Sequence, residues 1–343
     1  MNLEIYRDEA GFTALSKEWN ELLKRSTSNT IFLTWEWQST WWTHLGRGEL
    51  FLLAMRGDDG SLLGLAPLYI VETAQGERFL SVVGCADVSD YLDIIAATCQ
   101  EEAVCVALFN FLASVEAPAW DAAVLCNLPE SSPTCSMAES LAPRYGFTAR
   151  LRASDVCPVI NLPNTWEEYL ATLDKKQRHE LRRKMRRAER DAKIRRYIAG
   201  PEHDLSSEAE DFITLHQKSS AGKEEFMDER MKSFFRAMMQ CLAERGWLQL
   251  SFLEINGEKA ASMLCFDYNN EILVYNSGYD PRYAYLSPGL VLLSHCIQHA
   301  IALGRKRFDF LRGDEDYKFR FGGRETRIYQ LVIYNERKVH CTR

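Results

Sequence analysis

One order of apolar segments occurs twice along this chain, and the repeat limits the possible folds more than any single motif. In each half a helical pattern precedes two apolar runs separated by a turn: 12–24, 50–55 and 62–71 in the first half, and 208–219, 248–255 and 260–268 in the second. The second turn is Asn256-Gly257, a strong signal for a tight β-hairpin. Each half is therefore predicted to contain helices followed by an antiparallel hairpin.

Strand and helix patterns alternate after each hairpin. The first half continues with a strand over 79–84, a helix over 101–115, a strand over 122–128 and a helix over 135–145, and the second with a strand over 272–277, a helix over 288–303 and strands over 307–311 and 327–334. This order is typical of an α+β fold in which helices cover a mixed α/β sheet. The length of 343 residues suits two domains. We place their boundary near 155–158, which gives domains of 1–157 and 158–343.

Composition excludes several classes of protein. The chain is 46% hydrophobic and 26% charged, as expected of an ordinary globular protein. It has no run of about 18 apolar residues and no leader-like start, so we expect no transmembrane segment and a cytoplasmic location. Its ten cysteines include no C-x-x-C pair, and we expect them to be reduced core residues. His295 and His299 are four residues apart but lack an evident third ligand, so no metal site is predicted.

The segment 175–196 is strongly basic, with twelve Lys or Arg residues and three acids. We expect it to continue a long helix from Trp166 to about Arg190, with Thr165 as its cap. Apolar side chains recur on one face of this helix, so its charges can simply form a solvated surface. The alternative is a surface that follows the phosphates of a nucleic acid. Binding to tRNA is therefore possible although not favoured, and binding to DNA is not expected.

Chemically active residues are concentrated in the segment 308–323. A short aromatic strand leads there into a loop of acids, a tyrosine and basic residues, which would make a poor core. The candidate catalytic residues are Asp309, Glu315, Tyr317 and Lys318. Asp309 alternates with two phenylalanines and should leave the strand on the opposite face from them. The alternative is that Asp309 pairs with a neighbouring arginine and that Glu315 lies in a solvated turn.

The sequence Ser287-Pro288-Gly289 predicts the start of a helix that could bind an anion. Ser287 would cap the helix, and Pro288 would occupy its first position. The backbone N–H groups of Gly289 and Leu290 would then face the ligand, with Arg282 adding a charged contact. The alternative is an ordinary capped helix that binds nothing.

These motifs together resemble the acetyltransferase-like proteins first named for cellulose biosynthesis, the CelD type. The resemblance rests on Ser287-Pro288-Gly289, on Ala300 and Gly304 at the end of the following helix, and on the segments 308–315 and 318–320. It extends to 89–93 and to Trp35-Glu36-Trp37 and Trp41-Trp42 in the first half. CelD-type proteins belong to the GNAT superfamily and are similar to the Fem-type aminoacyltransferases, which carry two GNAT-like domains in tandem.

The resemblance implies that 1–157 is a degenerate GNAT-like domain and that 158–343 is a GNAT acyltransferase domain. It implies transfer of an acyl group, from acetyl-CoA or another acyl-CoA, to an amine of a sugar, an amino acid or a precursor of the cell envelope or an exopolysaccharide. A carboxylate such as Asp309 would take the amine proton and a phenol would protonate the leaving thiolate. Asp90, Tyr91 and Trp37 are the candidate contacts to the acceptor.

Two other functions remain open at this point. Fem-type enzymes use aminoacyl-tRNA as the donor, which the basic segment would favour. The usual GNAT phosphate loop, Q/R-x-x-G-x-G/A, is replaced here by Arg282-Tyr283-Ala284-Tyr285-Leu286-Ser287. The chain could therefore also be a non-catalytic module of exopolysaccharide assembly.

Overall fold

In a computed structural model the chain forms two compact units, and the structure describes residues 1–85 and 88–337. One unit comprises Met1–Asp155 together with the segment from Thr326, and the other comprises Val156–Glu325. The long strand β7 (Phe147–Asn161) contributes residues to both. The domain ranges 1–157 and 158–343 stay a prediction.

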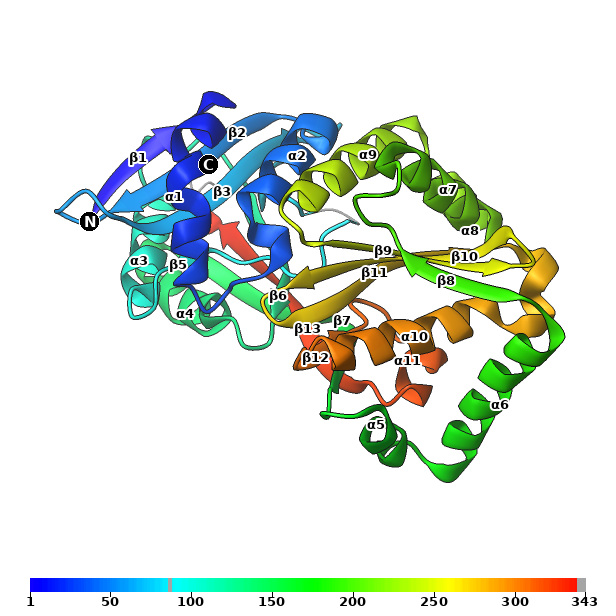
Figure 1. Cartoon of the computed structure of the whole chain (residues 1–343). Helices are drawn as coiled ribbons and strands as arrows, with labels where there is room; N and C mark the ends of the chain where they lie inside the picture. The colour runs from blue at the N-terminus through cyan, green and yellow to red at the C-terminus, as the bar shows by residue number, and fades with distance from the viewer. Residues whose placement is uncertain (86–87, 338–343) are drawn as a thin grey trace. The chain divides into compact units, whose positions relative to one another are not determined.

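The first unit contains a mixed sheet in the order β1-β2-β3-β4-β6-β13, with β5 paired to β3 (Figure 1). Its elements are β1 (Asn2–Tyr6), α1 (Ala10–Lys24), η1 (Ile31–Leu33), α2 (Trp35–Leu45), β2 (Glu49–Arg56), β3 (Leu62–Glu72), β4 (Arg78–Val82), β5 (Ile95–Ala96), α3 (Glu101–Ala113), β6 (Ala122–Pro129), α4 (Pro133–Leu141), η2 (Ala142–Tyr145) and β13 (Arg324–Asn335). Helix α1 packs on Leu52 through Gly11, and α3 packs on Gly64 through Val104. Gly64 pairs with Met55, which is three residues from Leu52 on β2 and so points to the other face. The two helices therefore cover opposite faces of the sheet.

The second unit contains a sheet in the order β12-β11-β10-β9-β8, with the end of β7 beside β12. Its elements are α5 (Trp166–Thr172), α6 (Lys175–Asp191), β8 (Ile194–Ile198), α7 (Leu205–Lys218), α8 (Ala221–Phe226), α9 (Glu229–Glu244), β9 (Leu248–Ile255), β10 (Glu258–Tyr268), β11 (Glu271–Tyr279), η3 (Pro281–Leu286), α10 (Pro288–Ala302), β12 (Arg307–Asp309) and α11 (Asp316–Arg320). Helices α7 and α9 cover one face of β9–β11 and α10 covers the other (Figure 1). One apolar core of this unit lies between the sheet and α10.

Both units have the same topology, which confirms the duplication read from the sequence. In each, helices separate a first strand from an antiparallel hairpin, a third antiparallel strand follows, and a helix leads to a strand parallel to that third strand. The hairpin turn at Asn256-Gly257 lies between β9 and β10 as predicted, with both residues at positive φ.

Three sequence-based expectations are wrong. The single helix predicted over 166–190 is two helices, because Asp174 interrupts the pattern and caps α6 by accepting a hydrogen bond from the Gln177 N–H. Strand β7 was missed, since its half-exposed residues 147–156 lack an apolar run. Cys85 and Cys126 are joined by a disulfide, so not all of the cysteines are reduced; Cys341 lies outside the described residues.

Candidate functional site

A pocket forms in the second unit where two parallel strands separate. Strand β11 pairs with β12 only through Glu271–Leu273 and Arg307–Asp309. The chain then leaves the sheet through Leu311 and Gly313, both at positive φ, while β11 continues to Tyr279. The end of β11 therefore has no β12 residues beside it, and a pocket of about 380 Å³ lies against it. This volume is within the range typical of small-molecule sites.

The pocket lining combines apolar and polar side chains. Its lining residues come from α8, β10, β11, η3, the start of α10, the loop before α11 and α11 itself: Lys223, Met263, Val274, Ser277, Tyr279, Ala284, Ser287, Pro288, Gly289, Leu290, Leu293, Glu315 and Tyr317. Two predicted catalytic residues and three predicted cofactor-binding residues are thus brought together here. The others lie elsewhere.

The N-terminus of α10 opens into this pocket. Pro288 begins the helix as predicted, but Ser287 adopts the left-handed conformation (φ 55°) and its side chain makes no cap hydrogen bond, so the predicted cap is wrong. The first N–H groups of a helix have no partner within the helix, and they carry the positive end of its dipole. A Cβ placed on Gly289 would meet nothing within 4 Å, so the approach to these groups is open. The arrangement suits an anionic ligand.

Lys223, Glu315 and Tyr317 are among the titratable side chains that line the pocket. Lys223 donates a hydrogen bond to the Ser277 carbonyl, and burial lowers its pKa while Glu315 acts in the opposite direction. Burial raises the pKa of Tyr317, and the nearby Glu315 carboxylate adds to the effect. Tyr317 therefore stays a neutral proton donor near pH 7, and Glu315 is a carboxylate beside it. Lys223 was not predicted, and nothing in the sequence around it points to the pocket.

Lys318 makes contacts that fix the loop carrying Glu315. Its side chain is buried, and its ammonium group lies 3.2, 2.6 and 3.2 Å from the carbonyl oxygens of Leu311, Arg312 and Gly313. It also forms an ion pair of 2.9 Å with Glu315. An ammonium group has three donors, and these four acceptors occupy them. The contacts are those of a positioning residue, and Lys318 does not line the pocket.

Asp309 lies in the core and not at an exposed strand end. It is 1% exposed, and its carboxylate accepts a hydrogen bond of 2.7 Å from the Leu311 N–H. It is absent from the pocket lining. The carboxylate therefore holds the turn that leaves the sheet, and a role for Asp309 as a base stays a prediction.

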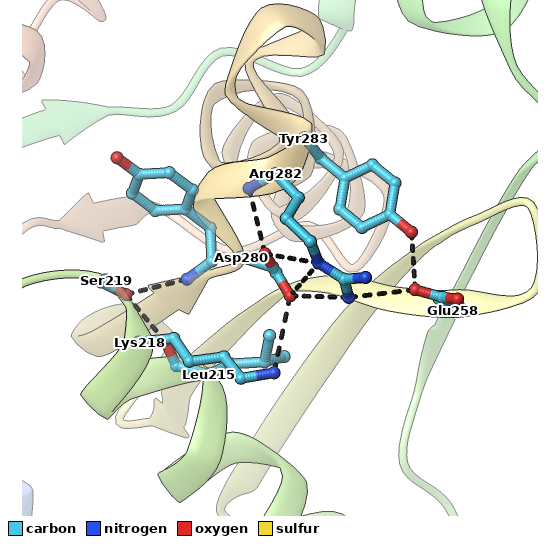
Figure 2. A network of polar contacts seen from close by, with 8 residues as sticks. Leu215, Lys218, Ser219, Glu258, Asp280, Arg282 and Tyr283 are labelled. Carbon is cyan, nitrogen blue, oxygen red and sulfur yellow. Dashed lines mark hydrogen bonds and ion pairs between the residues drawn. The ribbon is translucent and has the colours of Figure 1, made fainter.

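Arg282 does not line the pocket and is held in a polar network at the end of β11 (Figure 2). Its guanidinium donates to Asp280 at 3.1 and 2.9 Å and to Glu258 at 3.0 Å. Lys218 contacts the same aspartate at 3.5 Å, and the Ser219 hydroxyl accepts from the Tyr279 N–H. These contacts join α7 and η3 to the end of β11. The structure thus gives Arg282 partners that compete with its predicted contact to a ligand.

Asp280 should make this network sensitive to acid. The Arg282 guanidinium lowers the pKa of Asp280 from its ordinary 3.8 to about 2. A lowered pKa in the folded state stabilises the protein above about pH 4, and that stabilisation is lost as the pH falls toward 2. Because its cationic partners are half exposed, we expect Asp280→Asn to lower the free energy of unfolding by about 1–2 kcal/mol at pH 7.

Urea unfolding of both proteins at pH 7 and pH 2.5 measures this difference, which should shrink at the lower pH. Asp316→Asn is the matched control, because its ion pair with Arg320 is exposed on both sides. A difference of equal size at both pH values would show that the carboxylate charge is not the cause.

One residue of the basic helix α6, Arg187, contacts the N-terminus of α10. Helix α6 packs on η3 and α10. Arg187 lies 3.4 Å from the Ser287 hydroxyl, and its Nε is buried without a hydrogen-bond partner among the described residues. Arg182 and Arg183 instead pair with Glu167 and Glu180. The sequence alone does not distinguish these arginines, whereas the structure separates Arg187 from Arg182 and Arg183.

The predicted acceptor contacts lie in the first unit and are buried. Trp37 is fully buried and donates a hydrogen bond to the Ser89 hydroxyl at 2.9 Å. Asp90 and Tyr91 are also buried. Nearby, Asp93 accepts hydrogen bonds from Ser28 and Thr134 inside this unit. A role of Asp90, Tyr91 and Trp37 in acceptor binding stays a prediction.

The described residues also bear on metal binding and on membrane spans. Within 1–85 and 88–337, no cluster of three or more His, Cys, Asp or Glu side chains is arranged to hold a metal ion. Over the same ranges, none of the helices combines the length and the apolar character needed to cross a bilayer.

Comparison with known proteins agrees with this geometry. Residues 175–319 match a family described as acetyltransferase (GNAT) domain. The structure called FemX aligns over 100% of both chains with a TM-score of 0.69 and 12% sequence identity. A tandem GNAT protein from the clavulanic acid biosynthesis pathway aligns with a TM-score of 0.51 and 12% identity, over 96% of this chain and 98% of its own. No curated protein sequence matches the chain.

A third similar structure is the C-terminal domain of a putative lysylphosphatidylglycerol synthetase from Agrobacterium fabrum. It aligns over 95% of this chain and 92% of its own with a TM-score of 0.58 and 10% identity. Similarities at this level of identity establish the fold alone. The predicted fold class, an α+β fold with GNAT-like domains in tandem, is confirmed.

Proposed function

We propose that this chain, with its tandem GNAT-like fold, transfers an acyl group from an acyl-CoA to an amine, and that the donor binds in the pocket at the N-terminus of α10. The observation that carries the proposal is the pocket itself. A helix N-terminus without a side-chain cap, which favours anions, lies there beside a carboxylate and a buried phenol. The matching acetyltransferase family spans these elements.

Glu315, Tyr317 and Lys223 of the pocket lining suit the two proton transfers of the reaction. The amine attacks the thioester carbonyl, a C–N bond forms and the C–S bond breaks. Glu315 takes the proton that the amine loses, and Tyr317 gives its proton to the departing thiolate. Lys223 can return a proton to Tyr317, because burial has brought its pKa closer to neutrality. Lys318 holds Glu315 in place through its ion pair.

The acceptor that we favour is an amine of a sugar, an amino acid or a precursor of the cell envelope or an exopolysaccharide. The test is isothermal titration calorimetry of the full chain with acetyl-CoA, followed by release of free thiol in the presence of a panel of such amines. Saturable binding together with amine-dependent thiol release would support the proposal. Absence of acetyl-CoA binding would leave the aminoacyl-tRNA candidate and a non-catalytic module, and binding to tRNA separates these two.

The second candidate is a Fem-type transfer in which aminoacyl-tRNA is the donor. Two observations favour it: the similarity to FemX over the whole chain, and the basic helix α6 that packs beside the helix N-terminus. Both donors carry phosphate groups and an activated acyl carbon, which in acyl-CoA are separated by the pantetheine arm, so the N-terminus of α10 suits the phosphates of either donor. Binding of tRNA that weakens steeply with salt would distinguish them.

Arg187 should behave differently from the other arginines of α6. It lies at the helix N-terminus, so we expect Arg187→Gln to weaken acetyl-CoA binding about five- to tenfold, as the loss of one charged contact does. Replacing Arg182, Arg183 and Arg186 together should leave that affinity unchanged, because these side chains contact Glu167, Glu180 and the helix backbone.

Calorimetry with both variants measures the effect. Equal losses in the two would mean that α6 acts through its overall charge. If the triple variant instead lost most of its affinity for tRNA, the aminoacyl-transfer candidate would replace the first.

A further inference from the structure

A second pocket of about 180 Å³ lies in the same unit, between α10 and the edge of the sheet. Its lining comes from β8, β9 and α10. It shares no lining residue with the pocket at the N-terminus of α10. The proposed acyl transfer therefore leaves it without a role.

Strand pairing explains why polar groups meet there. Gln249 and Ser251 are two residues apart on β9 and so share one face of the sheet. Ser251 pairs with Ile198 on β8, and Arg196 is two residues before Ile198, so both belong to the same face. This face lies against α10, which contributes His295, Cys296 and His299 among others.

Two of these polar groups are buried without partners. Gln249 is 4% exposed and Ser251 is 2% exposed, and neither the Gln249 Nε2 nor the Ser251 Oγ has a hydrogen-bond partner among the described residues. A buried polar atom that is left unpaired costs about 1–3 kcal/mol. Natural proteins keep such groups rarely, and mainly where they serve a function.

A cation lies beside them. The Nη1 of Arg196 is 3.2 Å from the Nε2 of His295, and the Nδ1 of His295 is 2.9 Å from Gln298 Oε1. Since arginine only donates, the His295 Nε2 accepts and the ring is neutral, with its proton on Nδ1. The lowering of the His295 pKa by burial agrees with this assignment. Within the described part of the chain Arg196 has no acidic ion-pair partner, whereas its neighbour Arg195 pairs with Glu254.

We propose that this pocket is a binding site for a small monocarboxylate. The carboxylate would accept hydrogen bonds from Arg196, the Gln249 amide and the Ser251 hydroxyl. Its apolar part would pack on Ile198, Leu292 and Cys296, which complete that side of the pocket. A single cation together with an apolar wall suits a singly charged organic anion better than a phosphate dianion.

The size of the pocket limits the ligand. A cavity of about 150 Å³ holds benzene, so this pocket suits a molecule of about five to ten non-hydrogen atoms. Isobutyrate and benzoate are therefore the probes, each with its neutral amide as a matched control. Both carboxylates are small, so affinities on the order of millimolar are expected.

The experiment titrates the full chain with each probe and follows binding by ligand-detected NMR. At least one carboxylate should bind saturably, and its amide should bind at least tenfold more weakly. Saturation with acetyl-CoA and the Gly289→Asp substitution, which address the other pocket, should leave this binding in place. The outcome is thus independent of the proposed acyl transfer.

Substitutions of Arg195 and Arg196, which lie on opposite faces of β8, test whether the carboxylate binds in this pocket. Arg196→Gln should weaken binding at least tenfold, whereas Arg195→Gln, which removes an equal charge one residue away, should leave it within twofold. Both side chains are exposed, so both variants should fold. Equal effects of the two substitutions would overturn the proposal.

Ser251→Ala distinguishes a binding role of Ser251 from a purely structural one, because the two roles predict opposite changes in melting temperature and in carboxylate binding. Removing an unpartnered hydroxyl should keep or raise the melting temperature of the free protein while weakening carboxylate binding about five- to tenfold. The proposal is overturned if neither carboxylate binds below about 50 mM, if the amides bind equally well, or if Ser251→Ala lowers the melting temperature and leaves binding unchanged.

Discussion

Replacing Glu315 by glutamine is expected to lower kcat for acyl transfer about 10²- to 10⁴-fold, the range typical for loss of a general base. Glutamine keeps the size of the side chain but cannot take the proton of the attacking amine. Donor binding should change little, because the anion site is formed by the N-terminus of α10. The measurement is thiol release at saturating donor, with calorimetry of the same variant.

Asp314→Asn is the matched control, since this neighbouring carboxylate is exposed and does not line the pocket. Stability should change by less than about 1 kcal/mol in the Glu315 variant, because the side chain is 57% exposed and Lys318 keeps its three carbonyl partners. Normal turnover in Glu315→Gln would remove Glu315 from the mechanism and return attention to Asp309.

The repeat of apolar segments predicted two similar halves, each with helices and an antiparallel hairpin, whereas the GNAT-like assignment rested on the resemblance of the motifs. Hairpins, the helix α10 and the strands that flank it follow from local periodicity and from turn residues such as Asn256-Gly257, which act over short distances. The missed strand β7 is half exposed along most of its length, so its side chains carry little apolar pattern. The break between α5 and α6 had a readable signal, because Asp174 precedes Gln177 at the spacing of a helix cap.

The site was predicted only where its chemistry is local in sequence. Glu315, Tyr317 and the start of α10 lie in motifs that were readable. Lys223 reaches the pocket because α8 packs against the Ser277 carbonyl of β11, a contact between residues more than fifty positions apart. Ser287 and Leu311 adopt left-handed conformations that are unusual for their residue types, and tertiary contacts impose them. Burial of Asp309 likewise depends on the surrounding core.

The donor site gives the second large prediction: Gly289→Asp should weaken binding of acetyl-CoA at least 100-fold. The substitution places a negative charge at the N-terminus of α10, where the phosphates of the donor would lie, and the two charges would repel each other in a partly buried site. The free protein should fold normally, since a Cβ at this position meets nothing within 4 Å. An acidic group near a helix N-terminus is, if anything, stabilising.

Gly289→Asn separates charge from size, because asparagine has the shape of aspartate without its charge. We expect calorimetry to show a smaller loss for Asn than for Asp, with the gap narrowing as salt is raised, since screening weakens the repulsion. Similar losses in both variants would mean that any side chain at 289 blocks the pocket, and that the helix N-terminus binds no phosphate. Full affinity in the Asp variant would exclude the N-terminus of α10 as the donor site altogether, because a charge placed among the first N–H groups of the helix must act on any anion held there.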